Sequence, residues 1–237
     1  MTVAVVVAAG QGTRMRPLTE RRPKPLLPVA GKPLLEHVLD ACAAHVDRYV
    51  VVVGYEGEQV RETIGDEHAG SPVEYVSQPE QLGTAHAVEQ ARAYVDERFL
   101  VLNGDVVVDP EVVADLAATE GSAMAVKPVP DPRNYGVVAL DGRRVTDVVE
   151  KPADPPTALA NLGIYAFDPD AFAHVEATEL SERGEYEITE SIQRYIDAGN
   201  DVTAVEYDGP WLDVGRPWEL LDANEYLLSG LERDVRG

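Results

Sequence analysis

Two aspartates, Asp105 and Asp213, are the residues whose type and surroundings best suit chemistry. Asp105 comes shortly after the apolar run 99–102, and Asp213 closes the short segment 211–213 before a glycine-containing turn. A carboxylate at the carboxyl end of a parallel strand is well placed to hold a metal ion, and Mg2+ is usually held by one or two carboxylates together with substrate phosphates. The two aspartates therefore predict a metal site with Mg2+ as its cofactor.

The Asn103-Gly104 pair that precedes Asp105 has a second interpretation, because Asn-Gly is a strong signal for a tight β-hairpin. The next apolar run, however, leads to Asp109-Pro110 and then to a helix-like segment, so no alternating partner strand follows. We therefore expect Asp105 to lie at a strand end and not in a hairpin.

A glycine-containing loop after the first apolar run has the features of a phosphate-binding loop. Gly10 and Gly12 let the backbone bend close to a ligand and turn its N–H groups toward phosphate oxygens, and Arg14 supplies a planar, permanently charged fork. This geometry suits a triphosphate, with an ordinary strand-to-loop turn as the alternative. Met15 stands where a dinucleotide fingerprint needs its third glycine, and no Gly-Lys-Ser/Thr follows, so neither that fingerprint nor a Walker loop fits.

The elements that must position these residues alternate through the first half of the chain. Strands are expected at 3–9, 49–53, 73–76 and 99–102. Helices are expected at 33–46, 58–64, 84–95 and 111–118. Strands separated by helices favour parallel right-handed crossovers, which predicts an α/β fold with a three-layer, Rossmann-like sheet and ligands at the carboxyl ends of the strands.

After residue 118 the pattern changes to shorter strand-like runs separated by proline, glycine and aspartate. Strands are expected at 123–127, 136–140, 145–149, 162–167 and 202–205, with helices through 188–196 and near 218–228. We interpret this part as an antiparallel or mixed insertion that continues the sheet and covers one side of the cleft. The chain is therefore expected to form one domain, 1–237, with a small subdomain at 122–190.

Composition excludes several classes of protein. The 237 residues include 42 acidic and 20 basic side chains, a net charge of -22, so we expect no nucleic-acid binding. Residues 3–9 lack the flanks of a signal peptide, and no stretch approaches the roughly 20 apolar residues of a membrane span, which predicts a cytoplasmic protein without membrane contact. Cys42 is the only cysteine, which excludes an intramolecular disulfide and a cysteine-based zinc site. We interpret it as a small apolar residue on a helix face.

The basic residues are mostly arginines, with lysine only at Lys24, Lys32, Lys127 and Lys151. Many carboxylates with few lysines suggest a halophilic surface, adapted to a high-salt cytoplasm where screening weakens self-repulsion. On so acidic a chain, a site for anionic substrates must concentrate positive charge locally, and a compact lysine ammonium suits phosphate. Lys24, Lys32 and Lys151 lie in or beside segments with candidate chemistry, although Lys32 has the capping of a turn as its alternative role.

The amino-terminal motif is long enough to carry a family resemblance. Gly-x-Gly-Thr-Arg-x-Arg-Pro-Leu-Thr at 10–19, followed by Pro-Lys-Pro-Leu-Leu-Pro at 23–28, resembles the signature of the sugar-1-phosphate nucleotidyltransferases. The resemblance implies that the triphosphate is held by Ala9, Gly10, Gly12, Thr13 and Arg14. It also implies that Lys24 balances charge at the reacting phosphates.

A second segment, Gln-Pro-Glu-Gln-Leu-Gly-Thr-Ala-His-Ala at 78–87, resembles the family's base-reading element, in which a glutamine side chain and a glycine backbone recognise a pyrimidine. The resemblance assigns nucleotide binding to Gln78, Gly83 and Thr84. A helix start with Thr84 near the cap is the alternative, and both can hold because a helix N-terminus is itself a ligand platform.

Three middle segments, at 135–136, 150–152 and 161–165, resemble the family's sugar-binding elements in order and spacing. The resemblance implies sugar contacts from Tyr135, Gly136, Glu150 and Asn161. It assigns the sugar phosphate to Lys151, and it makes 185–189 a segment that closes over the sugar. Taken singly, the alternatives are a turn glycine, a surface ion pair, a strand-edge asparagine and a helix start.

The resemblance covers 3 to about 228 and implies transfer of a nucleotidyl group from UTP or dTTP to a sugar 1-phosphate, with release of pyrophosphate. The catalytic residues implied are Arg14, Lys24, Asp105, Lys151 and Asp213, with Mg2+ on Asp105 and Asp213. The motif at 81–87 resembles N-acetylglucosamine-1-phosphate uridylyltransferases, whereas 16–19 and 211–215 resemble glucose-1-phosphate thymidylyl- and uridylyltransferases. The sugar, and the choice between UTP and dTTP, stay open.

Some members of the family carry a carboxy-terminal left-handed β-helix with acyltransferase activity, and we expect no such domain here because the chain stops at Gly237. A non-catalytic regulator that binds nucleotide sugars is the alternative from another class. We disfavour it because a pure sensor need not keep magnesium ligands. The sequence leaves a homo-oligomer open.

Overall fold

The parallel part of the sheet grows from apolar runs that are buried on both faces. In the computed structural model, which describes residues 2–234 and side chains to residue 230, β1 (Val3–Ala8) lies between β7 (Phe99–Asn103) and β4 (Arg48–Val53). Strand β6 (Ser71–Ser77) follows β4, and all these pairs are parallel. Nearly all residues of β1, β4 and β7 are buried, as expected where helices cover both faces.

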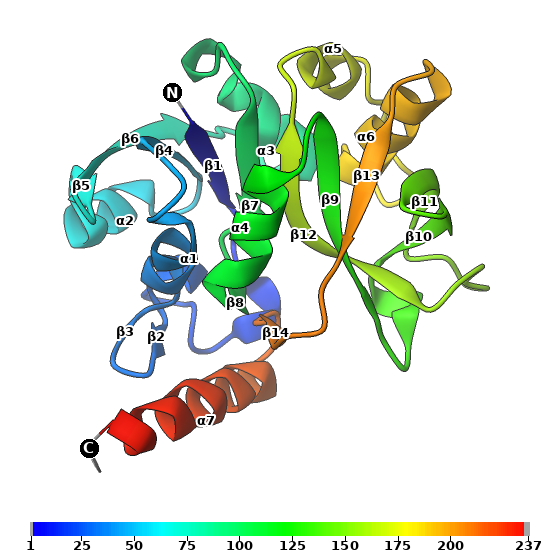
Figure 1. Cartoon of the computed structure of the whole chain (residues 1–237). Helices are drawn as coiled ribbons and strands as arrows, with labels where there is room; N and C mark the ends of the chain where they lie inside the picture. Colours follow the sequence, from blue (N-terminus) through cyan, green and yellow to red (C-terminus); the bar gives the residue numbers. More distant parts are fainter. Residues whose placement is uncertain (1, 235–237) are drawn as a thin grey trace.

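Helices cover both faces of the sheet and complete three layers (Figure 1). One face packs against α1 (Leu34–Cys42), α2 (Gly57–Ile64) and α4 (Pro110–Ala118). The other face packs against α3 (Thr84–Gln90), α5 (Ala171–Glu176) and α6 (Ile188–Asp197). Cys42 lies fully buried in the first of these cores. These layers confirm the predicted α/β fold class.

The sheet continues into a largely antiparallel part formed by β9 (Ser122–Pro128), β10 (Gly136–Asp141), β11 (Arg144–Glu150), β12 (Leu159–Phe167) and β13 (Val202–Glu206). Strand β12 pairs antiparallel with β7 and β9, whereas β13 runs parallel to β9. With β5 (Glu67–His68) at one edge, the described residues form one mixed ten-stranded sheet in the order β10-β11-β13-β9-β12-β7-β1-β4-β6-β5. Strand β13 lies outside the predicted subdomain limits 122–190 in sequence, yet it lies between β9 and β11 in the sheet. The strand order therefore does not mark these limits, and they stay a prediction.

Two short ladders and the last helix form a layer below the sheet (Figure 1). The ladders pair β2 (Pro28–Val29) with β3 (Lys32–Pro33), and β8 (Val106–Val108) with β14 (Trp211–Asp213). They enclose a small third core with Met15 and Val214, against which α7 (Pro217–Asp234) packs its residue Ala223. This core ties the carboxy-terminal part of the chain to the glycine loop.

Most predicted elements lie where the periodicity placed them, and the exceptions have local causes. The helix expected at 84–95 ends at Gln90, and a 3-10 turn follows at Arg92–Tyr94. Here the backbone changes to bonds between residues three apart: the Ala91 N–H donates to Val88 O, and the Tyr94 N–H donates to Ala91 O. Helix α5 and the two-residue strands were not predicted. Among the described residues, no helix is both long and apolar enough to span a membrane.

Candidate active site

The ladder between β8 and β14 brings Asp105 and Asp213 together. Asp213 lies opposite Val106 in this antiparallel pair, and the Val214 N–H donates to the Asp105 carbonyl oxygen at 2.9 Å. Strand β8 pairs with β14 and not with β7, so Asn103-Gly104 forms no hairpin, as predicted. Both carboxylates line the same cleft at the carboxyl edge of the parallel strands.

Charge around the two carboxylates is unbalanced in a way that fits a divalent cation. Lys24, only 8% exposed, places its Nζ 2.5 Å from Asp105 Oδ2. Burial raises the pKa of Asp213 to about 6, and the neighbouring negative charge of Asp105 adds to the increase. Two close oxygen ligands of like charge suit a hard cation such as Mg2+. Among the described residues, no group of three or more His, Cys, Asp or Glu is arranged to hold a metal ion, so substrate phosphates or water would complete the coordination.

The glycine loop packs tightly on Lys24. Gly12 adopts a left-handed conformation with φ of 61°, and a Cβ at this position would lie 2.9 Å from the Lys24 Cβ. Thr19 Oγ1 donates to the Gly12 carbonyl oxygen at 2.7 Å and closes the loop. Met15, which replaces the third glycine of a dinucleotide fingerprint, is fully buried in the third core. The loop is therefore shaped by packing beneath it, and its upper surface is left to a ligand.

Arg14 differs from most other cations of the site because its guanidinium is exposed and makes no hydrogen bond or ion pair with the described part of the chain. It lines both of the site's clefts, and the Gly215 backbone lies beside it. A permanently charged fork with all its donors free is ready to bind phosphate oxygens.

The first cleft has a volume of about 380 Å3. All the predicted nucleotide-binding residues line it: Ala9, Gly10, Gly12, Thr13, Gln78, Gly83 and Thr84. Three of the predicted catalytic residues, Arg14, Lys24 and Asp105, line it as well. The structure thus brings the two predicted nucleotide motifs to one cleft, which we call the nucleotide cleft.

Gly83 and Thr84 are clasped by the segment 185–188. Gly83 has φ of 112°, and a Cβ there would lie 2.5 Å from the Tyr186 carbonyl oxygen. The Tyr186 N–H donates to Leu82 O at 2.7 Å, and the Ile188 N–H donates to Thr84 Oγ1 at 3.0 Å. The start of α3 is therefore held by a segment about a hundred residues away in sequence, and the Thr84 hydroxyl already accepts a hydrogen bond within the protein.

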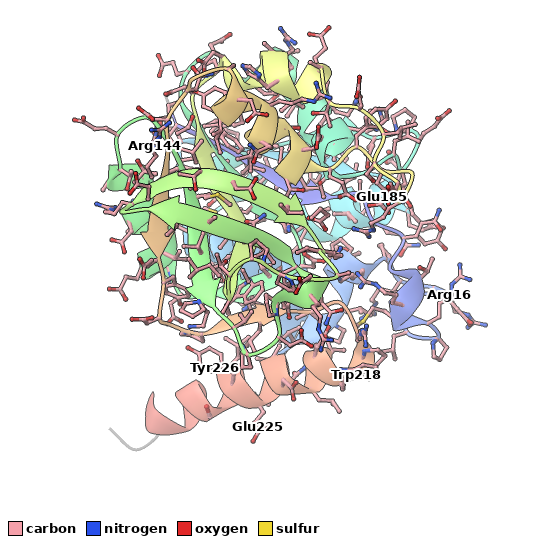
Figure 2. All side chains as sticks on the ribbon, turned by 90° about the vertical axis from the view of Figure 1, so that its right-hand side faces the viewer. Arg16, Arg144, Glu185, Trp218, Glu225 and Tyr226 are labelled. Carbon is pink, nitrogen blue, oxygen red and sulfur yellow. The ribbon has the colours of Figure 1, made fainter. Side chains whose placement is uncertain are left out.

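A second cleft of about 410 Å3, the sugar cleft, adjoins the first and shares Arg14, Thr84, Asn103, Asp105 and Glu185 with it. All the predicted sugar-binding residues line it: Tyr135, Gly136, Glu150 and Asn161. The predicted catalytic residues Lys151 and Asp213 line it as well. Figure 2 shows Glu185 on the same side of the molecule as the amino-terminal segment that carries Arg16.

Close packing shapes the sugar cleft around Gly136. Gly136 pairs with Glu150 in the β10–β11 hairpin, and a Cβ on Gly136 would lie 2.8 Å from Thr189 Cγ2 and 3.4 Å from Asn161 Cβ. Asn161 Nδ2 donates to the Tyr165 hydroxyl at 2.6 Å, and Asn161 Oδ1 accepts from the Gly163 N–H at 3.0 Å. Gly136 thus lies in a strand with close contacts on the cleft wall, and the alternative interpretation as a turn glycine is wrong.

The predicted sugar-phosphate ligand Lys151 is already ion-paired. Its Nζ lies 2.9 Å from Glu150 Oε1, and the same oxygen accepts from Arg183 Nη1 at 3.1 Å. Arg183 also reaches Glu187 Oε1 at 3.1 Å. Lys151 itself has a left-handed backbone with φ of 42°, and its N–H donates to Tyr135 O at 3.0 Å. A sugar phosphate would have to compete with Glu150 for this ammonium.

Sequence reasoning missed several residues that line the clefts. Gln81 lies within the base-reading motif, and its Nε2 donates to Ala9 O at 2.6 Å. The Trp211 ring packs against the Tyr135 ring with 4.9 Å between the centroids and an interplanar angle of 58°, and its buried Nε1 has no acceptor among the described residues. Arg183, which reaches the cleft only through folding of its loop, had no local signal in the sequence.

Comparison with known proteins shows the family of this chain. Residues 3–230 match the nucleotidyl transferase family, and the chain belongs to it. The bifunctional protein GlmU of Methanocaldococcus jannaschii is 42% identical over 99% of this chain. The alignment covers 56% of GlmU, so the chain spans about half the length of this relative. The UTP–glucose-1-phosphate uridylyltransferase AglF of Haloferax volcanii is 38% identical over 94% of this chain and 96% of that protein.

Solved structures show the same fold. A Bacillus anthracis protein described as a glucose-1-phosphate thymidylyltransferase, solved with sucrose, has a TM-score of 0.85 and 28% identity over 95% of both chains. A UDP-glucose pyrophosphorylase solved with UDP-glucose has a TM-score of 0.89 over 97% of this chain and 99% of that one. At 24% identity, the second likeness concerns the fold alone.

Proposed function

We propose that this chain transfers a nucleotidyl group from a pyrimidine nucleoside triphosphate, UTP or dTTP, to a sugar 1-phosphate, and releases pyrophosphate. The observation that carries the proposal is the convergence of Asp105 and Asp213 where the nucleotide cleft and the sugar cleft join. Among the candidates, the likeness to AglF over nearly the whole of both chains favours UTP and glucose 1-phosphate. The motif at 81–87, which resembles N-acetylglucosamine-1-phosphate uridylyltransferases, keeps N-acetylglucosamine 1-phosphate in the test.

In the proposed reaction, an oxygen of the sugar phosphate attacks the α-phosphorus and forms a new P–O bond. The bond from the α-phosphorus to its bridging oxygen breaks, and the electron pair leaves with pyrophosphate. Such an in-line displacement needs positioning and charge neutralisation and no covalent nucleophile.

This chain's residues can supply both. Arg14, free and at the junction of the clefts, would stabilise charge growing on pyrophosphate, and Lys24 would neutralise the reacting phosphates. Lys151 would exchange Glu150 for the attacking phosphate and align it. Asp105 and Asp213 would hold Mg2+, which supplies neutralisation of phosphate oxygens when bound.

The direct test is pyrophosphate release with Mg2+, in which UTP, dTTP, CTP, ATP and GTP are each combined with glucose 1-phosphate and N-acetylglucosamine 1-phosphate. We expect release with UTP or dTTP and with one of the two sugars, and loss of release when EDTA removes the metal. Binding of nucleotide sugars without release in any combination would instead favour the regulatory alternative.

We also propose that the acidic surface is an adaptation to high salt, since the net charge is -22 and only four of the 20 basic residues are lysines. Unfolding curves in dilute buffer and in molar potassium chloride test this. The free energy of unfolding should be larger in salt, and equal stability in both would contradict the adaptation.

A further inference from the structure

The buried amide of Gln78 is held by two acceptors inside the protein. Gln78 is 4% exposed, and its Nε2 lies 3.0 Å from the Gly83 carbonyl oxygen and 3.0 Å from His86 Nδ1. Because a carbonyl oxygen only accepts, the amide atom that faces Gly83 must be the nitrogen. Both amide hydrogens of Gln78 therefore have partners.

This arrangement also sets the state of the His86 ring. An amide nitrogen only donates, so His86 Nδ1 accepts, and the ring proton of the neutral imidazole is on Nε2. The ring is held in place by α3 and by Tyr186, whose ring centroid lies 6.3 Å away. Without the His86 acceptor, the second N–H of Gln78 would be unpaired, and rotation of the whole amide, which exchanges Nε2 with Oε1, would lose only the bond to Gly83.

The remaining polar atom of Gln78, Oε1, accepts no hydrogen bond from the described residues. The buried side-chain atoms that lack a partner among the described residues are Arg48 Nε, Glu89 Oε2 and Trp211 Nε1. Gln78 Oε1 also lacks a donor among the described residues, but it is not one of these buried atoms, so it is not fully buried. Since Gln78 lines the nucleotide cleft, we infer that Oε1 is reached from there. The cleft thus meets an acceptor at this position.

We propose that His86 is a positioning residue for base recognition: it binds the second amide hydrogen of Gln78 and so keeps Gln78 Oε1 as the acceptor that reads an N–H of the base. This inference rests on the proposed function and specifies its base selectivity. Uracil and thymine carry a hydrogen on N3, whereas N3 of cytosine has a lone pair in its place. An acceptor fixed at this point selects UTP or dTTP over CTP.

The test measures equilibrium binding of UTP and CTP by isothermal titration calorimetry with Mg2+, so that it does not depend on turnover. His86→Phe removes the acceptor and keeps a ring against Tyr186, and His86→Asn restores an acceptor oxygen near the position of Nδ1. His174→Phe is the matched control, because His174 is also half-buried and packs edge-on against a tyrosine, Tyr195, at 5.2 Å. His174 lies outside both clefts as the described residues define them.

The wild type and His174→Phe should bind UTP more tightly than CTP, and His86→Phe should reduce that ratio by about 10-fold, as expected for an unpaired buried donor. His86→Asn should recover most of the ratio. Equal binding of UTP and CTP by the wild type, an unchanged ratio in His86→Phe, no recovery in His86→Asn, or an equal loss in His174→Phe would each overturn the proposal. If the expected ratios appear but the wild type releases no pyrophosphate, the transfer reaction fails while the positioning role stands.

Discussion

The nucleotide cleft and the sugar cleft adjoin, yet they are built in different ways. The nucleotide cleft is lined mainly by two short glycine-containing stretches, 9–14 and 78–84, together with the Lys24–Asp105 ion pair. Arg14, which lines both clefts, is unpaired within the described residues. The sugar cleft is lined by residues of β8, β10, β11, β12 and β14 and by the loop 183–187, and its cation Lys151 is held with Arg183 on Glu150.

The difference indicates how each substrate would be accepted. A triphosphate would meet a preformed surface with free donors, which costs little reorganisation. A sugar phosphate would have to exchange into an existing ion-pair network, where charge-assisted hydrogen bonds are strong and directional. Changes at the junction should therefore affect turnover, and changes in the sugar cleft should mainly affect the KM for the sugar phosphate.

The largest effect is expected at the junction, for Asp213→Asn. It keeps the shape of the side chain but removes one charge of the carboxylate pair, and kcat should fall by about 100- to 1,000-fold. Steady-state pyrophosphate release checks this. Asp109→Asn is the control, because Asp109 accepts a hydrogen bond from the Tyr226 hydroxyl and is not among the described residues that line the two clefts. This variant should keep near wild-type turnover.

Glu150→Gln should have the next largest effect. The substitution frees Lys151 but also removes the charged acceptor that Glu150 is predicted to offer the sugar hydroxyls. We expect the second effect to be larger, so the KM for the sugar 1-phosphate should rise by about 10-fold while the KM for UTP stays within about two-fold. Separate titrations of the two substrates measure this. Equal increases in both KM values would show that the two clefts do not act as distinct regions.

A smaller effect is expected for Gly136→Ala, because the added methyl group would lie 2.8 Å from Thr189 Cγ2 and must displace it. The KM for the sugar phosphate should rise by about 3- to 10-fold, with a loss of stability of about 1 kcal/mol. Gly230→Ala is the matched control, since a Cβ there meets nothing within 4 Å. Thermal unfolding and sugar titration of both variants distinguish a local clash from a general effect of alanine.

The smallest effect is expected for Lys32→Ala. Lys32 pairs with Asp40 and, within the described residues, lies outside the nucleotide and sugar clefts, in contrast to the interpretation that groups it with Lys24 and Lys151. Turnover should stay within about two-fold of wild type, as is usual for an exposed ion pair. A strong loss of turnover would mean that the region of positive charge extends beyond the two clefts.

The parts of the site that could be predicted from sequence are those whose signal is local. The stretch from Ala9 to Arg14 and the Gln78–Thr84 stretch each carry their own glycines and polar groups, and both line the predicted cleft. Asp213 could be matched with Asp105 because each lies at or just beyond the end of a strand-like segment, although the ladder that joins them is only three residues long on each strand.

The ion-pair network of the sugar cleft could not be predicted in the same way. Arg183 contacts Glu150 across 33 positions because an irregular loop folds back, and no periodicity encodes that contact. The clasp of Tyr186 on Gly83 is similar, since it joins two backbone segments and depends on the absence of a Cβ. Tertiary placement of irregular segments determined both.

The central claim, that Asp105 and Asp213 share one divalent ion at the junction, is tested most directly by titrating Mg2+ into the protein with a nonhydrolysable UTP analogue present. The wild type and Asp109→Asn should bind Mg2+ with the same affinity, whereas Asp105→Asn and Asp213→Asn should each bind it at least about 10-fold more weakly, because each lacks one anionic ligand. Wild-type Mg2+ affinity in either of these two variants would contradict the claim.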